Sequence, residues 1–351
     1  MRQALELARL GNNGTRPNPL VGCIIVRNGK VVGDGYHKKA GGDHAEVMAL
    51  HKAGTLAKGA DVYVTLDPCC HIGRTGRCTD ALIQARVGRV FSSMGDPHDP
   101  SHLGEKILKT NNIPFSRGLL LEDSRLLNQI YLKNVQTSLP YVTLKMASTL
   151  DGKIATIRGF SKGITGLESR KIVHTLRASA DAILTGSGTV LADDPHLGVR
   201  YVRGKSPIRV VVDSTLKIPL RAKIYRDNHV IVFTTSLATQ KKLEILKKHG
   251  INVIVSKQKI SLPHVLHSLF EHNIFNLFVE CGSTLATALL SEGLVDRYIQ
   301  FIAPKLLGGD ESPTPFDGPN PLNFSNIQTL QHVSYSPSGD DLMVDGLLHI
   351  Y

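Results

Sequence analysis

The apolar positions in the first half of the chain alternate between two spacings. Short apolar runs typical of buried strands are separated by stretches whose apolar residues recur at helical spacing. These runs predict strands at Val21–Val26, Val31–Tyr36, Asp61–Leu66 and Arg89–Met94, and helices at 2–10, 43–53, 78–85 and 119–135. Asn28-Gly29, between the first two strands, is typical of a two-residue hairpin turn. The alternation predicts a mostly parallel sheet covered by helices.

The second half continues this alternation but ends differently. An opening strand is predicted at Tyr141. Further strands are predicted at Ala182–Thr185, Ile208–Asp213, Val230–Thr234, Val253–Val255 and Leu277–Glu280. The segment from Val333 to Tyr351 has the pattern of a hairpin that turns at Pro337-Ser338-Gly339. We therefore predict an α/β protein with two domains, residues 1–138 and 139–351, divided at the short polar segment 136–140.

Length and composition agree with two ordinary globular domains. The chain has 351 residues, and no apolar run approaches the ~18 residues that span a membrane. Glu6 and Arg9 interrupt the apolar N-terminal segment, which is typical of an amphipathic helix rather than a signal peptide. The five cysteines do not form a disulfide framework. We expect a cytoplasmic protein without a membrane partner.

The formal net charge of +11 leaves several classes of partner open. Nucleic acid is one, since basic surfaces bind phosphates. However, the 41 Lys and Arg residues are spread along the chain, and there is no tryptophan on which a base could stack. An anionic small substrate or a solvated basic surface explains the charge more simply, and we expect no nucleic-acid partner.

The stretch Thr65 to Cys78, together with His44-Ala45-Glu46, carries the candidate chemistry. A catalytic zinc ion uses three protein ligands, and His44, Cys69 and Cys78 would supply them. Zinc lowers the pKa of a bound water toward ~7, and Glu46, not itself a ligand, would relay the proton. Asp43 would cap the helix that carries His44 and Glu46. Each residue alone is better interpreted as a structural thiol or core histidine, whereas the four in this order favour a metal site.

Cys70 is interpreted differently from its neighbour. Nucleobase deaminases usually have two cysteines three residues apart, but the residue three after Cys69 is Ile72. Cys70 would point away from a site that Cys69 occupies, so we expect it in the pocket wall. The ligand pair is then Cys69 and Cys78.

The segment Pro68-Cys69-Cys70-His71-Ile72-Gly73-Arg74-Thr75-Gly76-Arg77-Cys78 resembles the deaminase half of the bifunctional riboflavin-biosynthesis deaminase–reductases. The run Pro17-Asn18-Pro19-Leu20-Val21-Gly22-Cys23 matches a second signature of that family, and the resemblance covers nearly the whole chain. It implies a cytidine-deaminase-like first domain, in which Asn18 and the loop with His71 and Arg74 hold the substrate.

Two glycine-bearing strand ends in the second half suit a cofactor, although no Gly-x-Gly-x-x-Gly fingerprint follows a strand. They are Thr185–Pro195 and Phe278–Thr284. Free backbone N–H groups at a helix start can bind dinucleotide phosphates, and a simple tight turn explains each segment equally well.

The resemblance assigns this half to a dihydrofolate-reductase-like domain that uses NADPH. The family's cofactor contacts fall on Ala147, Thr189, Asp193, Ser214, Gly282, Ser283, Thr284 and Leu285. Its sugar-phosphate contacts fall on Ser161, Arg177, Leu197, Arg200 and Glu280. The two arginines and the serine could grip a phosphate, because guanidinium binds it in bidentate fashion. Without the resemblance, the two arginines would be interpreted as surface salt bridges.

Three positions depart from the family pattern. Gly163 stands where the family usually has a tryptophan, Cys281 replaces a glycine, and Asp96-Pro97-His98-Asp99-Pro100 replaces Asp-Pro-Asn-Pro. The loss of an aromatic wall could weaken cofactor binding by ~1–3 kcal/mol.

The resemblance implies a cytoplasmic riboflavin-pathway enzyme with Zn²⁺ and NADPH as cofactors. Zinc hydroxide would deaminate 2,5-diamino-6-ribosylamino-4(3H)-pyrimidinone 5′-phosphate, and NADPH would then reduce the ribosylamino product to its ribitylamino form. The family also implies a homo-oligomer formed through the reductase domain. Three alternatives stay open: a deaminase with a decayed reductase half, a zinc-dependent RNA or nucleoside deaminase, and a zinc-binding regulator without activity.

Overall fold

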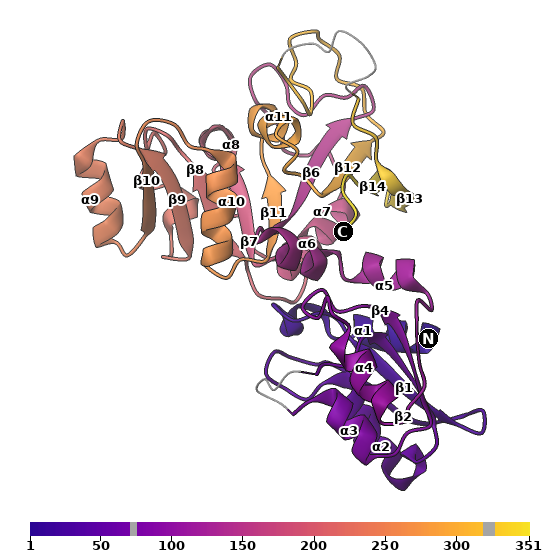
Figure 1. Cartoon of the computed structure of the whole chain (residues 1–351). Helices are drawn as coiled ribbons and strands as arrows, with labels where there is room; N and C mark the ends of the chain where they lie inside the picture. The colour runs from indigo at the N-terminus through magenta and orange to yellow at the C-terminus, as the bar shows by residue number, and fades with distance from the viewer. Residues whose placement is uncertain (71–75, 319–326) are drawn as a thin grey trace. The chain divides into compact units, whose positions relative to one another are not determined.

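The computed structural model describes residues 1–70, 76–318 and 327–351, and divides into two compact units (Figure 1). The first comprises Met1–Ser138 together with Tyr351, and the second comprises Leu139–Ile350. The chain thus passes from one unit to the other between Ser138 and Leu139, and Tyr351 is grouped with the first unit.

The first unit is a five-stranded sheet flanked by helices, in the order β2-β1-β3-β4-β5. Its strands are β1 (Gly22–Arg27), β2 (Lys30–Tyr36), β3 (Asp61–Leu66), β4 (Arg89–Met94) and β5 (Phe115–Arg117). Its helices are α1 (Arg2–Arg9), α2 (Ala45–Ala53), α3 (Cys78–Gln84), α4 (Leu103–Thr110), α5 (Leu121–Leu127) and α6 (Gln129–Thr137), with 3₁₀ turns η1 (Asn12–Thr15) and η2 (Gly54–Ala57).

Three predictions for this unit needed correction. β1 pairs antiparallel with both β2 and β3, and only β3-β4 and β4-β5 are parallel, so the sheet is mixed rather than mostly parallel. The helix expected at 119–135 is two helices, which meet at Asn128. The expected cap at Asp43 is wrong, because α2 begins at Ala45 with His44 as its N-cap residue.

The hairpin prediction is confirmed, and glycines bring a helix close to its second strand. Asn28 and Gly29 both have positive φ, 51° and 75°, as a type I′ turn requires. A Cβ atom on Gly35 would lie 2.5 Å from the backbone oxygen of Ala45 and 2.7 Å from the nitrogen of Ala49. Only glycine allows α2 to approach β2 this closely.

The second unit is built on a nine-stranded sheet, in the order β10-β9-β8-β7-β11-β6-β12-β14-β13. The strands are β6 (Tyr141–Thr149), β7 (Ala182–Gly186), β8 (Ile208–Val212), β9 (Val230–Thr235), β10 (Asn252–Ser256), β11 (Asn276–Glu280), β12 (Arg297–Ala303), β13 (Gln331–Ser338) and β14 (Asp341–Leu347). The helices are α7 (Leu167–Ser179), α8 (Ser187–Asp193), α9 (Gln240–Lys248), α10 (Leu262–Glu271) and α11 (Ser283–Ser291), with a 3₁₀ turn η3 (Lys223–Tyr225). Neighbouring strands are parallel from β10 to β12, and the antiparallel β14 and β13 complete the sheet as predicted.

Two apolar clusters cover opposite faces of this sheet. Alternate residues of the strands, such as Leu184 and Ile183, belong to different clusters because successive side chains point to opposite faces. Helices α10 and α11 contribute to one cluster, and α7, α8 and α9 to the other. The central strands are therefore buried on both sides, and their carboxyl ends are the open edge where a site can form.

We predict that Gly35→Ala lowers the free energy of unfolding of the first unit by about 1–3 kcal/mol, since an added methyl group must push α2 off the sheet. Urea unfolding would measure the change. Gly76→Ala is the matched control, because a Cβ there meets no atom of the described residues within 4 Å. Equal unfolding free energies for the two variants would contradict the proposed close contact.

Candidate functional site

Three predicted metal ligands meet in the first unit. His44 precedes α2, Cys69 follows β3, and Cys78 is the first residue of α3. Their ligand atoms all lie within 4.8 Å of one another. His44 Nδ1 is 3.1 Å from Cys78 Sγ and 3.4 Å from Cys69 Sγ. One imidazole and two thiols are donors that zinc prefers, and a fourth position for water completes a catalytic site.

The local backbone explains why these three side chains meet. β3 ends at Leu66, and the backbone oxygen of Cys69 accepts a hydrogen bond from the N–H of Thr79 at 3.2 Å. The N–H of Cys78 donates to Cys69 Sγ at 3.4 Å. Hydrogen bonding from the Cys78 and His44 side chains lowers the pKa of the Cys69 thiol. Cys69 is therefore suited to be a thiolate ligand.

Glu46 lies next to this group without belonging to it. It occupies the first turn of α2, and its side chain is buried, with 3% of its surface exposed. Burial, and then the charge of Cys69, raise the pKa of the Glu46 carboxyl to about 7. A carboxyl group with such a pKa can both accept and return a proton at neutral pH.

His37 is a buried polar residue that the sequence did not single out. Its Nδ1 donates to the backbone oxygen of Asp43 at 3.1 Å, so its Nε2 accepts from the Asn18 amide nitrogen at 3.1 Å. Its ring lies 5.6 Å from that of His44. A histidine directly after a predicted strand was the available signal. His71 and Arg74, two predicted substrate contacts, lie outside the described residues.

The second unit holds a pocket of about 740 Å³ at the carboxyl ends of β6, β7 and β11. Ten of the predicted contacts line it: Ala147, Ser161, Arg177, Thr189, Asp193, Leu197, Arg200, Glu280, Gly282 and Ser283. Ser161 Oγ donates to the Asp193 carboxylate at 3.0 Å. Gly163 also lines the pocket, so its wall has no side chain at that position.

Three predicted cofactor contacts do not line this pocket. The Ser214 carbonyl accepts hydrogen bonds from the hydroxyls of Thr234 and Thr235. Thr284 Oγ1 donates to Asp317 at 2.9 Å, and Leu285 packs against the apolar core. Thr284 and Leu285 fall within α11, whose turns point successive side chains away from one another.

A mostly buried ion cluster lines the pocket. Arg177 donates to both Glu280 oxygens, at 2.6 and 3.0 Å, and to the Gly198 carbonyl at 3.1 Å. Lys145, which the sequence analysis missed, places its Nζ 3.9 Å from Glu280, and burial lowers the pKa of Lys145. A lysine inside the apolar run of β6 was the signal for it. Arg177 is thus engaged with Glu280 rather than free to bind a phosphate.

Comparison with known proteins identifies two regions. Residues 140–344 match the family model described as the RibD C-terminal domain, and residues 1–94 match the cytidine and deoxycytidylate deaminase zinc-binding region. No helix in the described ranges is both long and apolar enough to cross a bilayer.

Relatives match over most of their length. The chain is 45% identical to riboflavin biosynthesis protein RibD of Aquifex aeolicus over 88% of this chain and 87% of that protein. It is 42% identical to the Escherichia coli RibD, covering 88% of each. A solved structure of Acinetobacter baumannii RibD superposes with a TM-score of 0.85 at 36% identity, covering 99% of this chain and 97% of that one. A Thermotoga maritima diaminohydroxyphosphoribosylaminopyrimidine deaminase/5-amino-6-(5-phosphoribosylamino)uracil reductase has a TM-score of 0.83 at 32% identity, covering 98% and 96%.

We predict that acid destabilises the second unit through His174. Its Nδ1 accepts the Arg200 N–H at 2.8 Å, and burial and the charges of Arg177 and Arg200 lower the pKa of His174 to about 4. An unfolded histidine has a pKa of about 6.5, so the unfolded chain binds this proton first. Stability should be constant above pH 6.5 and fall as the pH decreases toward 4, as urea unfolding would measure.

His174→Asn keeps an acceptor near Nδ1 and should flatten this pH dependence. The exposed His264→Gln is the control and should leave it unchanged. Parallel pH profiles for the wild type and His174→Asn would contradict the assignment.

Proposed function

Since the chain belongs to the RibD family of bifunctional riboflavin-biosynthesis proteins, we propose that it converts one phosphorylated pyrimidine in two steps. The chain is a zinc-dependent deaminase joined to an NADPH-dependent reductase. The proposed substrate is 2,5-diamino-6-ribosylamino-4(3H)-pyrimidinone 5′-phosphate, which loses its 2-amino group before the ribosyl group is reduced to ribityl. Residues 1–138 are assigned to the first step and 139–351 to the second.

The observation that carries the deaminase assignment is the buried Glu46 carboxyl beside His44, Cys69 and Cys78. These three residues would hold zinc, which supplies an activated water when bound. The Glu46 carboxyl, with its raised pKa, would take up a proton from the attacking water and return it to the departing nitrogen. Asn18, whose amide nitrogen is engaged by His37, presents its carbonyl oxygen to an N–H group of the pyrimidine.

The reductase assignment rests on the pocket at the ends of β6, β7 and β11. NADPH carries the hydride, so the protein has to orient cofactor and sugar rather than provide a nucleophile. Gly282 and Ser283 stand at the start of α11, whose free N–H groups suit the cofactor phosphates. Lys145 lines the pocket beside the Glu280 carboxylate, and its ammonium group can donate a hydrogen bond to the sugar.

We assign the binding of the substrate phosphate to Arg170 and Arg200. Arg177 is bound to Glu280, whereas Arg170 and Arg200 have no carboxylate partner within the described part of the chain. Both guanidinium groups lie about 6 Å from the Tyr201 ring, and both residues line the pocket. Two unpaired guanidinium groups near one ring can converge on a single dianion.

We expect Arg170→Gln to raise the reductase KM for the phosphorylated intermediate about 10- to 100-fold, the worth of a charge-assisted hydrogen bond of about 1.5–3 kcal/mol. Its kcat and the deaminase rate should change little, as initial rates of NADPH oxidation and ammonia release would show. Lys171→Gln, on the exposed side of α7 and paired with Glu168, is the control. An unchanged KM would remove Arg170 from the phosphate site.

Product analysis tests the whole proposal. The purified chain should release ammonia from the diamino substrate without NADPH, and should give the ribitylamino product when NADPH is added. Glu46→Gln should bind zinc normally but lose at least ~10²-fold in ammonia release, the usual worth of general acid–base catalysis.

Supplied with the deaminated intermediate, Glu46→Gln should still oxidise NADPH, which makes this reaction the internal control for folding. If Glu46→Gln released ammonia at the wild-type rate, Glu46 could not be the residue that transfers the proton. If the wild-type chain did not oxidise NADPH with this intermediate, the reductase assignment would be rejected and only the deaminase activity would remain. That result is expected if Gly163 disables the second site.

We also propose where the protein is located and how it assembles. All five cysteines are free thiols, which suits a reducing cytoplasm. A homo-oligomer formed through the reductase domain stays a prediction from the family.

A further inference from the structure

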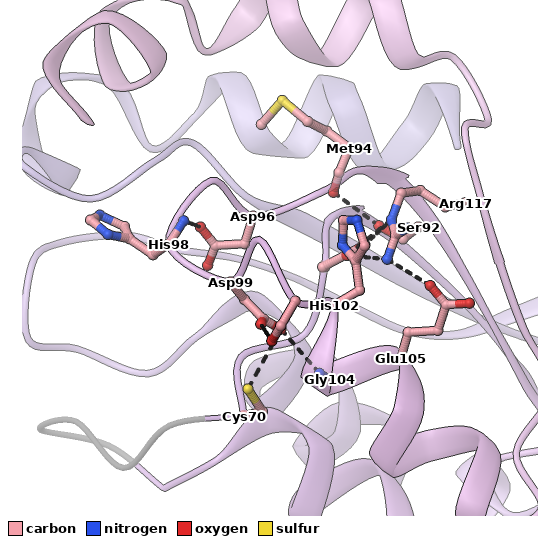
Figure 2. A network of polar contacts seen from close by, with 12 residues as sticks. Cys70, Ser92, Met94, Asp96, His98, Asp99, His102, Gly104, Glu105 and Arg117 are labelled. Carbon is pink, nitrogen blue, oxygen red and sulfur yellow. Dashed lines mark hydrogen bonds and ion pairs between the residues drawn. The ribbon is translucent and has the colours of Figure 1, made fainter. Parts of the chain in front are cut away.

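We propose that the first turn of helix α4, together with Arg117 of β5, positions Cys69 for the metal. This inference rests on the proposed zinc site and adds residues that are not ligands. Asp67, Pro68 and Cys70, which surround Cys69 in sequence, contact Arg117, Gly104 of α4 and Asp99 before α4, respectively. Figure 2 shows the contact between Cys70 and Asp99.

Asp67 forms the strongest of the three contacts. Its carboxylate accepts from Arg117 Nε at 3.0 Å and from a terminal nitrogen of Arg117 at 2.6 Å, with 5% of its side chain exposed. Arg117 also donates to Glu105 of α4 at 2.8 Å (Figure 2). Because a bidentate charge-assisted pair fixes direction as well as distance, it holds the chain two residues before the ligand.

Pro68 transmits this constraint to Cys69. The Asp67 N–H donates to the Met94 oxygen at 2.9 Å, so β3 stays paired with β4 up to the proline. The Pro68 oxygen lies against Gly104 of α4, where a Cβ atom would come within 2.6 Å of it. The φ angle of a proline is fixed. Because Asp67 and the Pro68 carbonyl are both held in place, the backbone at Cys69 has little freedom.

Cys70 secures the other side of the ligand. Its Sγ donates to Asp99 Oδ2 at 3.7 Å, and the same oxygen accepts the Gly104 N–H at 3.1 Å (Figure 2). Cys70 therefore contacts the 96–100 run, which is one of the departures from the family pattern. A thiol is a weak donor, so this contact contributes less than the Asp67–Arg117 pair.

The other end of β3 provides a matched control. Arg89 binds Asp61 with two hydrogen bonds, at 3.3 and 3.2 Å, as Arg117 binds Asp67. Asp61 begins the strand and lies far along it from Cys69. Arg89→Lys thus removes the same kind of contact without touching the segment that carries the ligand.

The test measures zinc affinity of the full chain by competition with a chelator, and the visible spectrum of the Co²⁺-loaded protein. Arg117→Lys keeps the charge but loses the bidentate geometry, and should weaken zinc binding about 10- to 100-fold and shift the cobalt bands. Gly104→Ala should act in the same direction. Arg89→Lys should leave affinity and spectrum unchanged.

Cys70 supplies a rescue pair. Cys70→Ala should weaken zinc binding, and Cys70→Ser, which can still donate to Asp99, should restore it. Circular dichroism of each metal-free variant establishes that it is folded, and Gly104→Ala serves in place of Arg117→Lys if the latter does not fold.

Wild-type zinc affinity and cobalt spectra in folded Arg117→Lys or Gly104→Ala would overturn the inference, as would equal losses in Arg89→Lys. A wild-type chain that binds no zinc would instead reject the proposed function itself.

Discussion

The first unit depends on bringing one strand end and two helix starts to a single point. β3, α2 and α3 are separate in sequence, and each contributes one ligand atom to a group within 4.8 Å. One imidazole and two thiols held this close together form a set of donors that suits a zinc ion. The close approach of α2 to glycines of β2 and the fixing of the segment after β3 are the structural conditions for that convergence.

In the second unit the corresponding constraint is the pairing of buried charges. Glu280 ends a strand that is buried on both faces, and its charge requires partners, which Arg177 and Lys145 provide. Removing one partner from such a cluster leaves an uncompensated buried charge, which typically costs about 3–5 kcal/mol. These three residues line the pocket and also stabilise the fold, so substitution of any one of them is expected to destabilise the second unit.

Sequence patterns predicted what is local or strongly periodic. Asn28-Gly29 predicted a hairpin, and most strand positions followed from apolar runs, although β12 was not predicted. The spacing of His44, Cys69 and Cys78 predicted a group that the structure brings together. The patterns failed where tertiary contacts decide. Asp43 is a good cap by residue type, yet the helix begins one residue later than that placement requires. No local pattern pairs Arg177 with Glu280, because the two residues are 103 positions apart in the chain. His37 and Lys145 are single polar residues whose burial no local pattern reveals.

The charges of Lys145, Arg177 and Glu280 do not cancel, because two cations share one carboxylate. The surplus positive charge sits at the floor of a cavity that also contains Arg170 and Arg200. In the absence of substrate this surplus attracts counterions from the buffer, and divalent oxyanions such as sulfate match it in shape and charge. Affinities of the cavity for an anionic ligand measured in such buffers therefore report competition with those ions, and understate its intrinsic affinity.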